Sequence, residues 1–284
     1  MCGFFLGISI LAPGFSGSLV AIAMGVYHEI IRIISNPLKK IKQNLMFCLP
    51  VGVGAVISAV LFILAFRQLF DSYEKAVYLL FVGLIAGSIP LVFNEVRKIG
   101  FKYFYLLGAL GAFIIAIAMG VSTSGGGLMS GNAAASTSDW LGLAIGGLAA
   151  GVTALIPGMS LSTVLVVLGV YSPLIYTAEA LLRLEFSYLI PIGIFFICTA
   201  IGLMATARGI KHVFAKYPGF SNTTVLGFQF GSLISIMYQS HQIVDTNFTW
   251  VMGAIALVAG LGISVLFIVL GKTMNKSETV EEPE

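Results

Sequence analysis

Long uncharged apolar stretches alternate with short polar segments along most of the chain. Six of these stretches are about as long as a helix needs to be to cross ~30 Å of hydrocarbon. Their solidly apolar character differs from the alternating apolar and polar positions of a membrane β-barrel. The pattern therefore predicts an all-α polytopic membrane protein. The expected transmembrane helices cover residues 45–66, 76–94, 103–121, 186–207, 219–240 and 248–271.

Two further apolar stretches, residues 1–27 and 140–178, are each interrupted by a Pro-Gly pair. Proline removes a backbone donor and clashes with the preceding helical turn, while glycine tolerates a sharp reversal. Residues 1–12 are too few to cross the membrane, whereas 140–178 as one straight helix would be about twice too long. Each stretch is expected to form a Pro-Gly-broken, re-entrant helical hairpin. Two full crossings remain an alternative for the second stretch.

The two broken stretches contain the same motif. Residues 7–27 align without a gap with residues 151–171, 144 positions further along the chain. The identical pairs are Gly7/Gly151, Leu11/Leu155, Pro13/Pro157, Gly14/Gly158, Ser16/Ser160, Ser18/Ser162, Val20/Val164, Gly25/Gly169, Val26/Val170 and Tyr27/Tyr171.

The same 144-residue offset relates Gly83 and Gly87 to Gly227 and Gly231, whose four-residue spacing predicts close helix packing in lipid. The sequence thus predicts two inverted repeats, each a broken hairpin plus three transmembrane helices. The expected domains are residues 1–121 as the first repeat and 140–271 as the second, inverted repeat. Residues 122–139 are expected to form an extracellular Gly/Ser/Thr-rich loop, and residues 272–284 a cytoplasmic disordered tail.

The distribution of positive charge supports the hairpins. Only 10% of the residues are charged, against about 25% in soluble domains. If both motif stretches return to the side they entered from, 12 of the 15 Lys and Arg residues lie on one side, and Arg67, Lys75 and Arg183 lie on the other. A single crossing by each motif would divide them 8 to 7. The positive-inside rule then places both termini in the cytoplasm.

The broken motifs contain the residue types of an anion site. A helix that begins at membrane depth offers free N–H groups and the positive end of its dipole, to which small hydroxyl residues add donors. Two such tips facing each other would bind an anion without a buried Lys or Arg, although the motif could also be only a kink with a serine cap. The candidate substrate-binding residues are Pro13, Gly14, Ser16, Gly17, Ser18, Pro157, Gly158, Ser160, Ser162 and Thr163.

Three more polar residues are candidates for the same site. Gln229 lies within an apolar stretch, where it faces either the substrate or a neighbouring helix. Glu29 and Arg32 are one turn apart at the expected cytoplasmic entrance, where they bind a headgroup, handle protons, or simply form an interfacial ion pair.

Catalysis, metal binding and cofactors find no support in the sequence. The 3 histidines are scattered, and the 3 cysteines show no CxxC spacing. No hydrolase motif and no pair of intramembrane carboxylates is present. The chain is therefore not expected to be an enzyme, to use a metal or cofactor, or to bind nucleic acid.

PGFSGS…GVY at residues 13–27, PGMSLST…GVY at 157–171 and VGLIAGSIP at 82–90 resemble the bacterial polyprenyl-phosphate transporter family over nearly the whole chain. The resemblance implies a lipid flippase in the bacterial cytoplasmic membrane. It would return undecaprenyl phosphate from the outer to the inner leaflet, recycling the carrier for cell-wall (peptidoglycan) synthesis. The implied partners are the polyprenyl phosphate lipid and the phospholipid membrane, and a homo-oligomer is left open. The alternative is an inverted-repeat carrier of a soluble ion or small anion.

Overall fold

A computed structural model shows how the chain folds. Within the part of the chain that it describes, all regular elements are helices, in agreement with the predicted all-α fold. The described residues are 2–14, 17, 20–21, 24–26, 29–30, 32–33, 39–100, 102–124, 139–156, 159–243 and 248–278.

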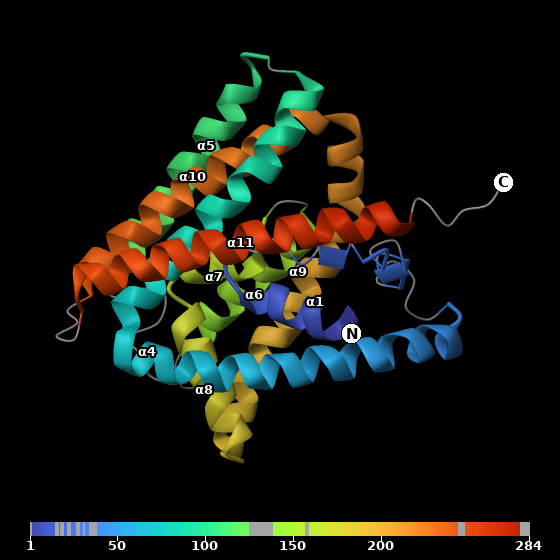
Figure 1. The fold of residues 1–284 in the computed structure, drawn as a ribbon. Coiled ribbons are helices and arrows are strands. Elements are labelled where there is room, and N and C mark those ends of the chain that lie inside the picture. The colour runs from blue at the N-terminus through green and yellow to red at the C-terminus, as the bar shows by residue number, and fades with distance from the viewer. Residues whose placement is uncertain are drawn as a thin grey trace.

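The helices whose full extent the structure describes lie at varied angles to one another (Figure 1). In chain order they are α1 (Cys2–Leu11), α4 (Ile41–Ile99), α5 (Tyr105–Ser124), α6 (Trp140–Ala154), α7 (Leu161–Val167), α8 (Tyr171–Leu182), the short 3-10 helix η2 (Phe186–Tyr188), α9 (Leu189–Lys216), α10 (Pro218–Gln242) and α11 (Trp250–Glu278).

Helix α4 contains two of the predicted transmembrane stretches. It bends at Tyr73, whose φ of −147° and ψ of 45° are not helical. The bend lies in the polar segment between residues 66 and 76, and Figure 1 shows the helix turning sharply near its middle. The two apolar runs therefore form two helical arms that return the chain toward the side from which it came.

Glycines allow α1 to pack closely on the first arm of α4, and α6 to pack closely on α9. A Cβ atom at Gly7 would lie 2.6 Å from the Ala55 carbonyl oxygen, and one at Gly151 would lie 2.1 Å from the Thr199 carbonyl oxygen. In each pair, residues later in one helix contact residues later in the other, so the two helices run parallel. Both members of the second contact lie 144 residues beyond those of the first, and the same holds for Gly3 with Val51 and Gly147 with Phe195.

The glycine pairs at four-residue spacing also mediate close contacts, as the sequence predicted. Gly83 and Gly87 on the second arm of α4 face α11, where a Cβ atom at Gly83 would lie 2.2 Å from the Leu257 carbonyl oxygen. Gly227 and Gly231 on α10 face α5 in the same way, with the Ala109 carbonyl oxygen 2.1 Å from a Cβ atom at Gly227. The last helix of each half therefore packs against the other half.

Four helices among the described residues are long and apolar enough to cross a membrane, or five if α7 and α8 are counted as one broken span. Helix α10, which contains the expected transmembrane stretch 219–240, is outside this set. It carries several buried polar residues, among them Ser221, Thr223 and Gln229. A helix surrounded by protein can carry such polar groups where a lipid-facing helix cannot. Helix α11 continues to Glu278, beyond the expected end of the second repeat at residue 271.

Candidate functional site: the crossing of the two motifs

The first motif turns directly after α1. The Pro13 side chain is fully buried, and Gly14 has a φ of +87°, a conformation that residues with a side chain rarely adopt. A Cβ atom at Gly14 would also lie 2.6 Å from the backbone nitrogen of Ile85 on α4. Glycine is needed here both for the turn and for the close approach to α4.

The second motif leads into the short helix α7. Ser160 precedes it in an extended conformation, with φ −102° and ψ 125°, and its Oγ atom lies 2.9 Å from the Oγ atom of Ser162. After α7 the chain bends by 110° into α8. The hydroxyl residues of this motif are thus held together at the start of a broken helix.

Hydrogen bonds join the two motifs. The Gly14 N–H donates to Oγ1 of Thr163 over 2.9 Å, although the two residues are 149 positions apart in the chain. The hydroxyl of Tyr171 donates to the Leu11 carbonyl oxygen over 2.8 Å. The turn of the first motif therefore lies against the hydroxyl segment of the second, and we call this place the motif crossing.

The GVY end of the motif forms the same turn in both copies. Gly25 and Gly169 have φ values of +69° and +68°. The Val26 N–H donates to the Ala21 carbonyl at 3.0 Å, and the Val170 N–H donates to the Leu165 carbonyl at 2.9 Å. This six-to-one bond around a left-handed glycine is the Schellman ending of a helix, so sequence identity here reflects identical backbone geometry.

The hydroxyls at the motif crossing are shielded from solvent. Ser162 is 0% exposed, Thr163 is 3% exposed and Ser160 is 7% exposed. The first N–H groups of a helix lack partners within the helix, so the start of α7 combines such donors with hydroxyls. Because α7 has only 7 residues, its dipole adds little, and directed hydrogen bonds would provide most of the attraction for an anion.

The other predicted site residues do not all lie at the motif crossing. Gln229 on α10 is buried, and its Nε2 atom lies 3.5 Å from Oγ of Ser88 on α4. Ser88 is one helical turn after Ile85, the α4 residue that contacts Gly14. Glu29 and Arg32 form an exposed ion pair with each other. Gly17 lies beside Ile10 of α1. Ser16, Ser18, Pro157 and Gly158 lie outside the described residues.

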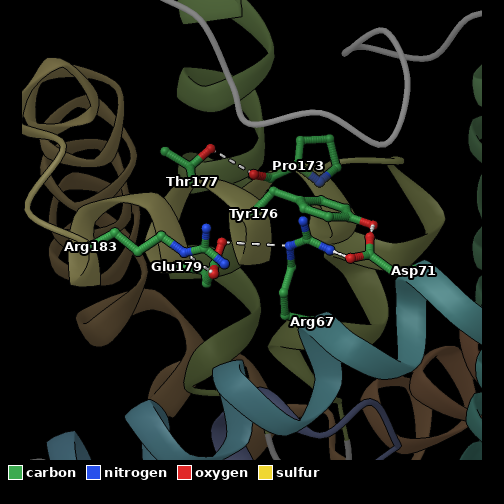
Figure 2. Close-up of polar contacts among 7 residues, drawn as sticks. All are labelled: Arg67, Asp71, Pro173, Tyr176, Thr177, Glu179 and Arg183. Carbon is green, nitrogen blue, oxygen red and sulfur yellow. Dashed lines mark hydrogen bonds and ion pairs between the residues drawn. The ribbon is translucent and has the colours of Figure 1, made fainter.

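Sequence reasoning missed two features of this region. One is the role of Tyr171 at the motif crossing, although its presence in both motif copies was a usable signal. The other is a polar cluster between α4 and α8, formed by Arg67 and Asp71 of α4, Tyr176 and Glu179 of α8, and Arg183 directly after α8 (Figure 2). Glu179 follows the long uncharged stretch immediately, and an acidic residue in that position was the available sign.

The long apolar helices fit a multi-pass membrane protein. A profile of the VCA0040-like family, described as undecaprenyl phosphate translocase-like, matches residues 6–252. The chain belongs to this family, which agrees with the resemblance seen in its motifs. No curated protein and no solved structure matches the chain.

Proposed function

We propose that the protein returns undecaprenyl phosphate from the outer to the inner leaflet of the bacterial cytoplasmic membrane, for reuse as the carrier of cell-wall precursors. Family membership supports transport of this lipid. The direction follows from the need to recycle a carrier that is released outside. The hydrogen bond between Gly14 and Thr163 is the observation that carries the proposal, because it brings the two motif copies to one place.

The repeated contacts support an inverted-repeat arrangement. The turns at Gly25 and Gly169 match, and so do the α1–α4 and α6–α9 contacts, at a constant 144-residue offset. With a positive-inside orientation, the first motif enters from the cytoplasm and the second from outside. The motif crossing then lies where a headgroup could be reached from either side in turn.

A polyprenyl phosphate presents a small anion on a long apolar tail. The tail can stay in hydrocarbon while the phosphate crosses between the helices, with Ser160, Ser162 and backbone N–H groups as its donors. This requires movement, because those hydroxyls are buried in the present state. The mechanism requires neither a cofactor nor a catalytic residue.

The test is transfer of labelled polyprenyl phosphate between leaflets of vesicles that contain the purified protein. Replacing both serines, Ser160→Ala with Ser162→Ala, removes two donors, each worth roughly 1.5–3 kcal/mol toward a charged ligand. We expect transfer to fall at least tenfold. Ser122→Ala is the matched control, because this hydroxyl is exposed on α5 and donates to the Ala118 carbonyl of its own helix.

Uptake of inorganic phosphate is measured in the same vesicles. If the wild-type protein moves inorganic phosphate but leaves polyprenyl phosphate in its original leaflet, the chain is a soluble-anion carrier and the flippase proposal is wrong. Unchanged lipid transfer in the folded double variant would instead show that the motif crossing is structural.

A further inference from the structure

The polar cluster between α4 and α8 has one buried carboxylate at its centre, that of Glu179 on α8. Glu179 is 7% exposed, and its two oxygens face two different guanidinium groups. Oε1 lies 2.6 Å from Nε of Arg183, and Oε2 lies 3.5 Å from Nε of Arg67 (Figure 2). A single anionic group thus bridges an arginine from α4 and an arginine that follows α8.

Arg67 has further partners. It forms an ion pair with Asp71 one turn along α4, and its guanidinium carbon lies 4.3 Å from the centre of the Tyr176 ring. The Tyr176 hydroxyl donates to Oδ1 of Asp71 over 2.9 Å. The guanidinium is therefore held in one orientation by a ring and a carboxylate, while its Nε side is turned toward Glu179.

Two guanidinium groups that converge on one anion form the arrangement by which proteins bind phosphate, because the planar fork of arginine matches phosphate oxygens as well as carboxylate oxygens. We infer that Arg67 and Arg183 form a docking site for a phosphate monoester, and that Glu179 occupies the position of the phosphate while no ligand is bound. This inference rests on the proposed function for the identity of the lipid. In the topology proposed above, the site lies at the outer face.

An exchange of anions is physically reasonable at this site. Breaking a buried ion pair without replacement is strongly unfavourable, because one charge is left unpaired. A phosphate that takes over the two arginines avoids that cost. The Arg183 side chain is 66% exposed, so it can bind a headgroup at the surface. The Arg67 side chain is only 26% exposed and lies deeper in the protein. Nε of Arg67 makes no hydrogen bond of good geometry with Glu179, so it can donate to a better-placed phosphate oxygen, while Nη1 stays paired with Asp71.

Aromatic rings connect this site to the motif crossing. Phe70, three residues after Arg67, has its ring centre 6.1 Å from that of Tyr171. Tyr171 also packs edge-on against Phe81 on the second arm of α4, at 5.5 Å, and its hydroxyl holds the Leu11 carbonyl. Release of Glu179 from Arg67 would loosen α8 from α4 directly beside the contact that closes the crossing.

The first experiment measures binding of inorganic phosphate and of farnesyl phosphate to the purified full chain in detergent. Glu179→Gln keeps the side-chain size but removes the resident anion, so affinity for both probes should rise about tenfold. Arg183→Gln leaves the Arg67–Glu179 pair in place and should lower both affinities about tenfold. Lys98→Gln, which breaks an exposed ion pair with Glu95 at the end of α4, is the matched control and should change neither.

A structural ion-pair cluster would behave differently. Glu179→Gln would then lower the melting temperature without tightening either probe, and that result, or unchanged affinity in Arg183→Gln, overturns the inference. Farnesyl phosphate binding more tightly than inorganic phosphate identifies the lipid headgroup as the ligand; equal affinities assign the site to free phosphate. Ser160→Ala with Ser162→Ala should slow leaflet transfer yet leave the response to Glu179→Gln intact, so failure of the transport proposal and failure of the docking site give separate results.

Discussion

At the scale of single residues, Gly14 shows how backbone geometry and packing act together. Its φ of +87° alone favours glycine, and the backbone nitrogen of Ile85 fills the space where a side chain would begin. Its own N–H is used in the bond to Thr163. A glycine at this position therefore makes both the turn and the contact with the second motif possible.

Gly14→Ala should destabilise the protein by more than the roughly 1–2 kcal/mol expected for a left-handed backbone carrying a Cβ atom, because α4 must also move away. Gly100→Ala is the control for a positive φ without a close neighbour, since Gly100 has a φ of +87°, a ψ of 146° and nothing within 4 Å of the added atom. Thermal unfolding followed by size-exclusion in detergent measures the difference. Equal losses in the two variants would show that the approach to α4 is not tight in solution.

At the scale of helices, the parallel pairs α1–α4 and α6–α9 depend on glycine at each point of contact. The helices approach so closely that a Cβ atom added at Gly7 or Gly151 would overlap a backbone carbonyl oxygen of the partner helix. Other glycines in the same helices have no such contact. Gly193 on α9, for instance, has nothing within 4 Å of an added Cβ atom.

This contrast predicts that replacing glycine by alanine lowers stability at one kind of position and does not lower it at the other. Gly151→Ala should destabilise the protein, because the Thr199 carbonyl oxygen lies 2.1 Å from the added atom and the helices must separate. Gly193→Ala should be neutral or stabilising by up to about 1 kcal/mol, since alanine favours a helix more than glycine does. Melting temperatures of both variants test the packing; stabilisation by Gly151→Ala would contradict the observed α6–α9 contact.

At the scale of the whole molecule, helices of the first repeat pack against helices of the second repeat. The second arm of α4 packs on α11, while α10 packs on α5, so the last helix of each half completes the other half. Such exchange ties the halves together while leaving α8 and the motif crossing at their junction. A movement that exposes the crossing must therefore open contacts of α7 and α8 rather than separate two independent bundles.

The proposed orientation predicts which side of the membrane residue 130 and the C-terminal end of α9 face. In a background without the 3 native cysteines, Ser130→Cys should react with an impermeant thiol reagent added outside, and Lys211→Cys should react only after the cells are opened. The reason is the positive-inside rule, which places Lys211 in the cytoplasm. Labelling of Lys211→Cys in intact cells, with Ser130→Cys protected, would reverse the orientation and assign the Arg67 site to the cytoplasmic face.

The sequence by itself determined the features that depend on local chemistry. Apolar length predicted the helices, and Pro13 and Gly14 predicted a break. The identity of Gly25 with Gly169 was visible in the alignment, and the structure shows that both residues make the same turn. Each of these is a property of a few adjacent residues in a known environment. The family relationship was equally visible in the motifs.

Only the tertiary structure decided which distant groups meet. The bond between Gly14 and Thr163, the bridge from Glu179 to Arg67, and the pairing of α10 with α5 join segments far apart in the chain. The periodicity of apolar residues shows that a helix has a face to bury, but it does not identify the helix that packs there. A charged residue at a helix end is interpreted from sequence as part of a loop, because the element that packs against it is not visible in the sequence. For that reason Arg67 and Arg183 counted only toward topology in the sequence, whereas in the folded protein they converge on one carboxylate.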